Sequence, residues 1–204
     1  MCVPTSLPLE AHFDTWPQTL PSPRRITSLA LLIYVPLTLG GLLWAKVAGS
    51  RWAWSLDEPW LLAPFWVRLS ISLALGFVSA LAVVAVTPRL VERSRWARAL
   101  HSQLKEVIAP LCPGEITALA LASGFAEEVF FRGAMQPVLG LLATSLIFGA
   151  FHFGPREAFP AWAFWAFVIG VVFGSIFELT GVLWGPVLAH VWINQRNMMF
   201  IKRD

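Results

Sequence analysis

The chain has 204 residues, of which 57% are apolar and only 13% are charged, with a net charge of +3. Soluble domains carry about 25% charged residues, so this composition, with a mean hydropathy of +0.66, excludes a water-soluble globule. No cluster of Lys and Arg is dense enough to bind nucleic acid through its phosphates. Charge-free runs of the roughly 17–25 residues that cross a bilayer cover 26–45, 69–88, 133–155, 158–177 and 179–195. The sequence therefore predicts an all-α, polytopic bundle of about six membrane helices.

The first part of the chain is expected to hold two of these helices. Residues 1–25 are predicted to be a poorly ordered tail, because they are Pro-rich and their acidic residues do not fit a cleavable signal. Spans are expected at 26–46 and 68–87, joined by a Trp-rich connection at the membrane interface. The segment 88–108 places apolar residues at helical spacing between Arg and Lys, which predicts an amphipathic helix on an anionic membrane face. Residues 26–112 thus comprise two spans and a surface helix.

Residues 113–204 are expected to form a catalytic core of four membrane helices. These start near Pro113, 140, 158 and 182, and they end past Arg132 and at about 153, 179 and 200. No internal repeat is present, and the chain is too short for two domains of this kind. The two cysteines, Cys2 and Cys112, form no metal-binding or disulfide pattern.

The basic residues predict how the chain is oriented. With six spans and the N-terminus inside, eleven of the 15 Lys and Arg residues fall on the inner side. Arg132 lies within a span, and only Lys46, Arg51 and Arg68 remain outside. Since basic residues concentrate in cytoplasmic segments, both termini are expected in the cytoplasm of a bacterial inner (cell) membrane.

Polar residues interrupt the apolar helices of the core. They are Glu127, Glu128 and Arg132 in the third helix, His152 in the fourth, Glu178 in the fifth, and His190 and Asn194 in the sixth. A charge at mid-bilayer costs at least about 2.5–3.5 kcal/mol, so such groups must face one another or water and indicate a functional site. Glu128 and Arg132 are four residues apart and can pair on one helix face. Glu127 is rotated by about 100° from Glu128 about the helix axis, so its carboxylate is not neutralised by Arg132.

The spacing also predicts that the polar residues of different helices converge. A turn at 137–140 places Glu127 and His152 at equal distances from it, and hence at the same depth. His190 and Asn194 share one face of the last helix. The alternative that these polar residues have only a structural role stays open. Glu128 and Arg132 can form a structural ion pair, and an intramembrane His or Asn often only joins two helices by a hydrogen bond. Glu178, His12 and His101 are expected to be solvated groups without chemistry.

Amide hydrolysis fits this set of side chains. It needs a general base for water and donors for the developing oxyanion. Glu127 can be the base, His152 can hold the same water, and His190 and Asn194 can donate to the oxyanion. The alternative is a zinc ion bound by Glu127, His152 and His190. The chain lacks HExxH and Asn is a poor zinc ligand, which favours glutamate-activated water without a cofactor.

Three motifs resemble those of the CAAX-protease and bacteriocin-processing (CPBP, or Abi) family of intramembrane proteases. They are EEVFFR at 127–132, FGAFH at 148–152 and HVWIN at 190–194, which match EExxxR, FxxxH and HxxxN in order. The resemblance covers about 113–200 and includes the CAAX prenyl endopeptidases.

This resemblance implies an endopeptidase that cuts near the C-terminus of a membrane-anchored or lipidated substrate. It assigns water activation to Glu127 and His152, the oxyanion hole to His190 and Asn194, and positioning of the site to Glu128 and Arg132. The chain is shorter than the better-known members, and it is more similar to small bacterial sorting peptidases such as the myxosortases. The competing hypothesis is a non-enzymatic membrane protein, an immunity factor or a transport scaffold.

Overall fold

The computed structural model describes residues 23–49, 52–152 and 159–204. The predicted all-α class is confirmed, since no β-strand forms in these ranges and Ser55 and Val182 make only an isolated bridge. The described residues form, in chain order, α1 (Pro23–Gly49), α2 (Phe65–Arg93), α3 (Arg95–Ile108), α4 (Pro113–Glu128), the π-helix η1 (Val129–Met135), α5 (Gln136–Leu139), α6 (Leu141–Ala150), α7 (Phe159–Thr180) and α8 (Trp184–Arg203). Most of the predicted tail lies outside these ranges, as do His12, Arg51 and Arg156.

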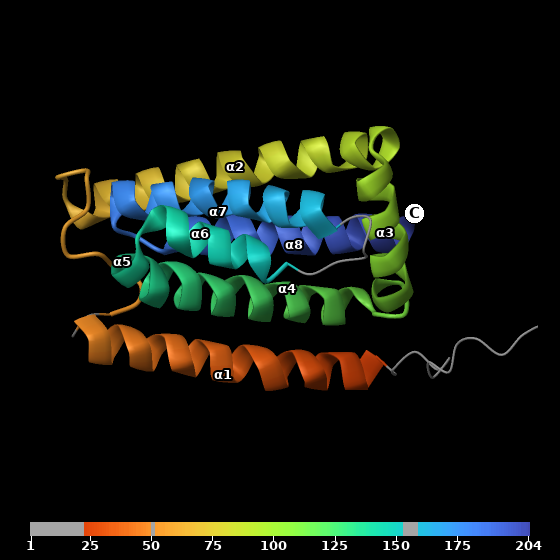
Figure 1. Ribbon diagram of the computed structural model, residues 1–204, viewed down its shortest axis with the longest axis horizontal. Coiled ribbons are helices and arrows are strands. Elements are labelled where there is room, and N and C mark those ends of the chain that lie inside the picture. Colours follow the sequence, from red (N-terminus) through yellow and green to blue (C-terminus); the bar gives the residue numbers. More distant parts are fainter. Residues whose placement is uncertain (1–22, 50–51, 153–158) are drawn as a thin grey trace, which may run out of the picture.

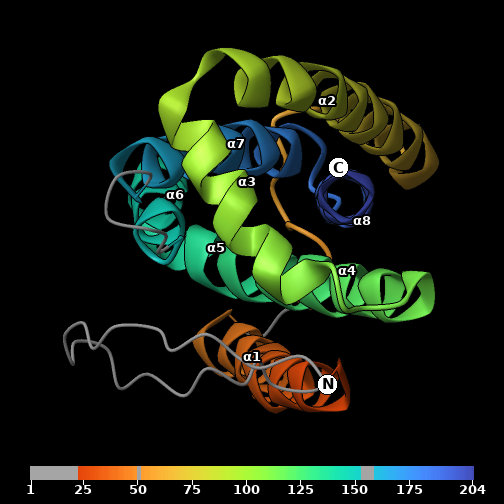
Figure 2. The ribbon, with the colours of Figure 1, turned by 90° about the vertical axis from the view of Figure 1, so that its right-hand side faces the viewer.

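The long helices run side by side along the bundle, and α3 crosses one of its ends (Figures 1 and 2). The axis of α3 is bent by 115° from that of the helical stretch Pro113–Leu139. At 88–108 the sequence predicted an amphipathic helix on a membrane face. α3 instead packs one of its faces on the end of the bundle. Ala97, His101 and Ile108 of this face are buried against the bundle. The prediction that His101 is solvated is therefore wrong.

Among the described residues, fewer helices qualify as membrane spans by length and apolar composition than the six predicted. Among the described residues, three helices are long and apolar enough to cross a membrane, Ser28–Ala48, Phe65–Arg93 and Pro160–Thr180, and a fourth is counted if the bent pair of α3 and the stretch after it is one span. The predicted spans at about 140–153 and 182–200 form the helices α6 and α8, but these two helices are not long or apolar enough to qualify as spans. α6 has ten residues, about 15 Å of helix, and α8 carries the buried polar residues and the basic end that lower its hydropathy.

The first helix presents apolar side chains to the outside. Leu32, Leu43 and Val47 of α1 are strongly exposed, as expected of a helix surrounded by lipid. The opposite face of α1 packs on α4 and η1. Trp52 and Trp60 in the following connection are also exposed, which suits amphipathic rings at a membrane interface.

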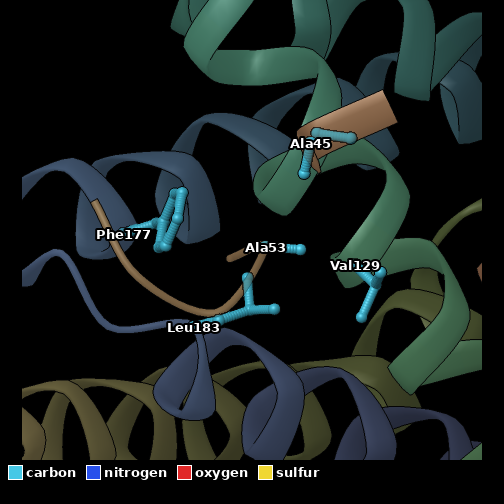
Figure 3. Packing of buried hydrophobic residues seen from close by; sticks show 6 residues of the cluster. Ala45, Ala53, Val129, Phe177 and Leu183 are labelled. Atoms are coloured by element: carbon cyan, nitrogen blue, oxygen red, sulfur yellow. The ribbon is translucent and has the colours of Figure 1, made fainter. Parts of the chain in front are cut away.

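The connection between α1 and α2 closes the end of the bundle opposite α3. Its backbone is held by the turn between α7 and α8, through hydrogen bonds from Leu56 N–H to the Gly181 carbonyl at 3.0 Å and from Leu183 N–H to the Trp54 carbonyl at 3.2 Å. Ala53 inserts into an apolar cluster that Figure 3 shows from close by. The cluster consists of Ala45, Ala53, Val129, Phe177 and Leu183 together with Ala134.

Two glycines allow α2 and α8 to touch along their backbones. A Cβ atom on Gly185 would lie 2.0 Å from the Ser72 carbonyl oxygen, and one on Gly76 would lie 2.2 Å from the Gly185 carbonyl oxygen. The Ser72 hydroxyl donates to the Val182 carbonyl at 2.8 Å and accepts from Gly185 N–H at 3.2 Å. This contact sets the position of α8, and with it the position of His190 and Asn194.

We expect Gly185→Ala to destabilise the protein by about 1–3 kcal/mol or more, because the added methyl group meets backbone that cannot move aside. Gly40→Ala is the matched control, since Gly40 is exposed on α1 and its Cβ would meet nothing within 4 Å. Thermal unfolding in detergent measures both variants. Equal midpoints for the two variants would contradict the tight contact between α2 and α8.

Candidate active site

The third predicted helix is not a regular α-helix throughout. α4 begins at Pro113, where the Glu115 carboxylate accepts a hydrogen bond from the Cys112 N–H at 2.8 Å and completes a capping box. The backbone widens into the π-helix η1 directly after the two glutamates. Insertions of this kind inside α-helices occur frequently at functional sites. A regular α-helix was predicted here, because apolar spacing in the sequence does not distinguish the two forms.

Glu128 and Arg132 form the predicted ion pair at the centre of the bundle. Arg132 Nη1 donates to Glu128 Oε1 at 3.0 Å, and both residues are 0% exposed. The same carboxylate oxygen lies 2.7 Å from Nδ1 of His190 on α8. Arg132 Nη2 also donates to the Gly170 carbonyl of α7 at 3.3 Å. The pair thus joins three helices, and its contact with His190 was not predicted.

Aromatic rings enclose the Arg132 guanidinium. Its central carbon lies 4.2 Å from the ring centre of Phe148 and 5.8 Å from that of Phe173. Both rings are almost completely buried, so these cation–π contacts are desolvated and can be worth about 2 kcal/mol. Gly170 makes room for the guanidinium, because a Cβ there would lie 3.3 Å from Arg132 Nη2.

A second buried polar side chain follows one turn after Arg132. Gln136 Nε2 donates to the Gly174 carbonyl at 3.0 Å and to Glu178 Oε1 at 3.1 Å. Glu178 is only partly exposed. Glu178 was predicted to be solvated; it is partly exposed, and it also accepts this hydrogen bond from Gln136.

Glu127 faces away from this buried pair and lines a cavity. Its Oε2 lies 3.8 Å from Nε2 of His190, beyond hydrogen-bond length. The Tyr34 side chain of α1 lines the same cavity. Glu127 was predicted to point in another direction than Glu128, and this placement agrees with the prediction. Glu127 is not isolated, however, because His190 lies close to its carboxylate.

His152 directly follows the last turn of α6, and its hydrogen bond defines its tautomer. Nδ1 lies 2.8 Å from the Phe148 carbonyl oxygen. Since a carbonyl can only accept, Nδ1 carries the proton and Nε2 of the neutral ring has a lone pair. His152 therefore lines the cavity as a potential proton acceptor.

Asn194 is held by a residue that was not predicted to belong to the site. Its Nδ2 donates to the Ser123 hydroxyl of α4 at 3.0 Å. An amide nitrogen has two N–H donors, so one of them stays available to a substrate. Ser123 and Tyr34 were missed because a single hydroxyl inside an apolar helix is common and carries no spacing signal.

The four residues predicted to be catalytic surround one cavity of about 690 Å³, and Glu127, His152, His190 and Asn194 all line it. This volume is typical of a site for a small molecule or a peptide segment. Apart from these residues, Tyr34 and Ser123, the walls are mostly apolar and extend from α1 across the bundle to α2 and the underside of α3. The convergence that the sequence spacing predicted is thus present, whereas the catalytic roles stay predictions.

The alternative zinc set does not come together in the described part of the chain. No group of three or more His, Cys, Asp or Glu side chains among these residues is placed to hold a metal ion. We therefore derive no step through a metal.

Glutamate, histidine and asparagine side chains from different helices thus surround one cavity inside the helix bundle. Residues 110–195, which carry all three motifs, match the family described as type II CAAX prenyl endopeptidase Rce1-like. Over these residues the chain is similar to this family of peptidases, which confirms the predicted resemblance to CPBP proteases. The narrower myxosortase subtype is not confirmed.

A curated relative is similar over part of the chain. It is the uncharacterized protein YpbD of Bacillus subtilis (strain 168), which is 36% identical over 92 residues, or 44% of this chain. The match covers 47% of YpbD, so the chain spans about half the length of this relative. No solved structure matches significantly.

We expect Arg132→Ala and Glu128→Ala each to destabilise the protein by about 3–5 kcal/mol, because each leaves a buried partner charge uncompensated. The double variant should cost less than the sum, since the partners share one interaction. Arg93→Ala, at an exposed position of α2, is the control and should stay within about 0.5 kcal/mol of the wild type. Unfolding in detergent provides the measurement, and wild-type stability of both single variants would contradict the central role of the pair.

Proposed function

We propose that the protein is an intramembrane endopeptidase that cleaves a membrane-associated protein near its C-terminus by means of glutamate-activated water. The observation that carries this proposal is the convergence of Glu127, His152, His190 and Asn194 on one cavity inside a membrane bundle. The family of residues 110–195 supports the same reaction class.

Glu127 is the general base of the proposed reaction. Its carboxylate removes a proton from a water molecule, and the lone pair of His152 Nε2 accepts the second hydrogen of the same water and orients it. The water oxygen then bonds to the scissile carbonyl carbon. When the C–N bond breaks, Glu127 returns the proton to the leaving nitrogen, so that the reaction consumes one water and regenerates the carboxylate.

His190 and Asn194 stabilise the oxyanion of the tetrahedral intermediate. Glu128 accepts the Nδ1 proton of His190, which turns Nε2 of the ring toward the side of Glu127. When the His190 ring is a positively charged imidazolium, with a proton on each nitrogen, its Nε2 proton and the second N–H of Asn194 donate to the substrate oxygen. Donors of this kind, placed before the reaction in a site shielded from water, reduce the barrier without reorganisation.

The cavity supports an apolar substrate segment. Its wall beneath α3 contains Leu100, Leu104, Trp96 and Ile108, and α7 adds Trp162 and Trp165. Such a wall suits the C-terminal segment of a membrane-anchored or lipidated protein, whose apolar groups remain out of water during cleavage. We propose that the substrate is bound in this way for C-terminal processing or sorting.

The proposed orientation places the α3 end of the bundle in the cytoplasm. Figure 1 shows the start of α1, the helix α3 and the C-terminus at the same end of the bundle. The basic residues Arg93, Arg95 and Lys202 are also at this end, on α2, α3 and α8. Positive charge next to the membrane favours the cytoplasmic face, here of the inner membrane of a bacterial cell.

We expect Glu127→Gln to slow cleavage by about 10²–10⁴-fold, because the amide has the same shape but cannot take a proton. Asn194→Ala should slow it by about 10²–10³-fold through loss of one oxyanion donor. The assay uses the full chain in lipid nanodiscs and a membrane-tethered reporter with an apolar C-terminal tail. Glu106→Gln, at an exposed position of α3, is the matched control.

Three outcomes of this assay, combined with a metal analysis of the purified protein, separate the alternatives. Stoichiometric zinc in the active protein, with activity abolished by chelation and restored by zinc, would establish the zinc site of Glu127, His152 and His190 in place of the metal-free mechanism. Wild-type cleavage by Glu127→Gln would reject the proposed peptidase mechanism, and an absence of any cleavage by the wild type would favour an immunity or transport protein.

The orientation is tested by cysteine labelling in intact cells. In a chain whose Cys2 and Cys112 are replaced by Ser, Arg95→Cys should react with an impermeant maleimide only after the membrane is opened. Trp60→Cys, in the exposed connection at the other end, should react without opening. Labelling of position 95 from outside would reverse the proposed orientation.

A further inference from the structure

His152, which orients the attacking water in the proposed mechanism, lies beyond the end of its helix. α6 ends at Ala150, and two hydrogen bonds tie His152 back to it. The backbone N–H of His152 donates to the Gly149 carbonyl at 3.0 Å, and Nδ1 donates to the Phe148 carbonyl at 2.8 Å. Both bonds are local to α6, so a neighbour from another helix is needed to hold the ring from a second direction.

The indole of Trp162 on α7 is this neighbour. Its ring centre lies 5.6 Å from that of His152, and the two ring planes are at 88°. The Phe148 ring lies 4.5 Å from the imidazole at an angle of 58°. Perpendicular and tilted arrangements at such distances are the favoured geometry of aromatic pairs. The imidazole therefore packs against one ring of its own helix and one ring of the next helix.

A backbone contact between α6 and α7 fixes the distance between the two rings. A Cβ atom on Gly149 would lie 2.6 Å from the Ala163 carbonyl oxygen, so the helices touch at this glycine. Gly149 is three residues before His152, and Ala163 directly follows Trp162. Since close-packed backbone resists displacement, the indole is held at one separation from the imidazole.

Trp162 is also on the side of α7 that belongs to the proposed site. Its side chain lines the same cavity as His152 and is partly buried. Phe164, two residues later, is 65% exposed on the outside of the helix. The first turns of α7 thus direct Trp162 toward the site and Phe164 away from it.

We infer that Trp162 is a positioning residue of the peptidase reaction. Its indole restricts the His152 ring to the orientation in which Nδ1 bonds to the Phe148 carbonyl and Nε2 remains free. The water that accepts this orientation lies in a constant direction from the proposed base, and positioning of this kind governs the rate. The inference rests on the proposed function, in which His152 orients the attacking water.

The test compares Trp162→Leu with Trp162→Phe in the reporter assay. We expect Trp162→Leu to lower kcat by about 10-fold, the upper end of what one perpendicular aromatic pair contributes. KM should change less than kcat, because leucine keeps the cavity wall apolar. Trp162→Phe returns a ring to the same position and should recover kcat to within about threefold of the wild type.

Two other residues of α7 provide matched controls. Trp165 lines the same cavity one turn further along, and Trp165→Leu should raise KM more than it lowers kcat, because it removes an indole from the proposed substrate wall. Phe164→Leu, on the exposed face, should leave kcat and KM at wild-type values. In detergent, Trp162→Leu should unfold within about 3 °C of Trp165→Leu, a difference of about 1 kcal/mol or less.

The outcomes separate this inference from the proposed function. Wild-type kcat in Trp162→Leu, with Glu127→Gln still slow, would overturn the inference and leave the peptidase mechanism intact. A raised KM at unchanged kcat would make Trp162 only a part of the substrate wall. A loss of kcat that Trp162→Phe does not recover, or that accompanies a midpoint well below that of Trp165→Leu, would assign the indole to helix packing, and each of these results would also overturn the inference. Wild-type rates in Glu127→Gln would instead reject the mechanism on which it rests.

Discussion

The Arg132 guanidinium lies fully buried in the centre of an apolar bundle, where an unpaired charge would cost several kcal/mol. Its partners come from three directions: Glu128 on its own helical stretch, the Gly170 carbonyl on α7, and the Phe148 ring on α6. Glu128 in turn accepts from His190 on α8. Four segments of the chain must therefore pack together before the buried guanidinium and its carboxylate have all of their partners. The same requirement brings the motif helices together and determines the orientation of His190.

The two ends of the bundle are closed in different ways, and this shapes the cavity. At one end the connection after α1 inserts Ala53 into a compact apolar cluster (Figure 3). At the other end α3 crosses the bundle (Figure 2). Residues of α3 form part of the wall of a cavity of about 690 Å³. The proposed catalytic groups lie between these ends, about 20 Å along α4 from Pro113. In the proposed function, a site at this depth gives an apolar substrate segment room without placing it in water.

Part of the site was predictable because it depends on distances along one helix. The four-residue spacing of Glu128 and Arg132 predicted their ion pair, and the turn near Gly140, which has a φ of 82°, placed Glu127 and His152 on a common cavity. The partners that come from another helix were not predictable. The bond from Glu128 to His190 depends on how α8 docks, and α8 docks through the backbone contact of Gly185 with α2.

The sequence by itself determined that the protein is an all-α membrane bundle and that polar side chains interrupt three of its motif helices. Hydropathy and helical spacing are local properties, so they need no knowledge of neighbouring helices. Only the tertiary structure decided that α3 packs on the bundle, that His101 is buried and Glu178 partly buried, and that Tyr34 lines the same cavity as Glu127. The physical reason is that a lone hydroxyl or imidazole leaves no periodic pattern in the chain. Its role follows from the helix that packs against it.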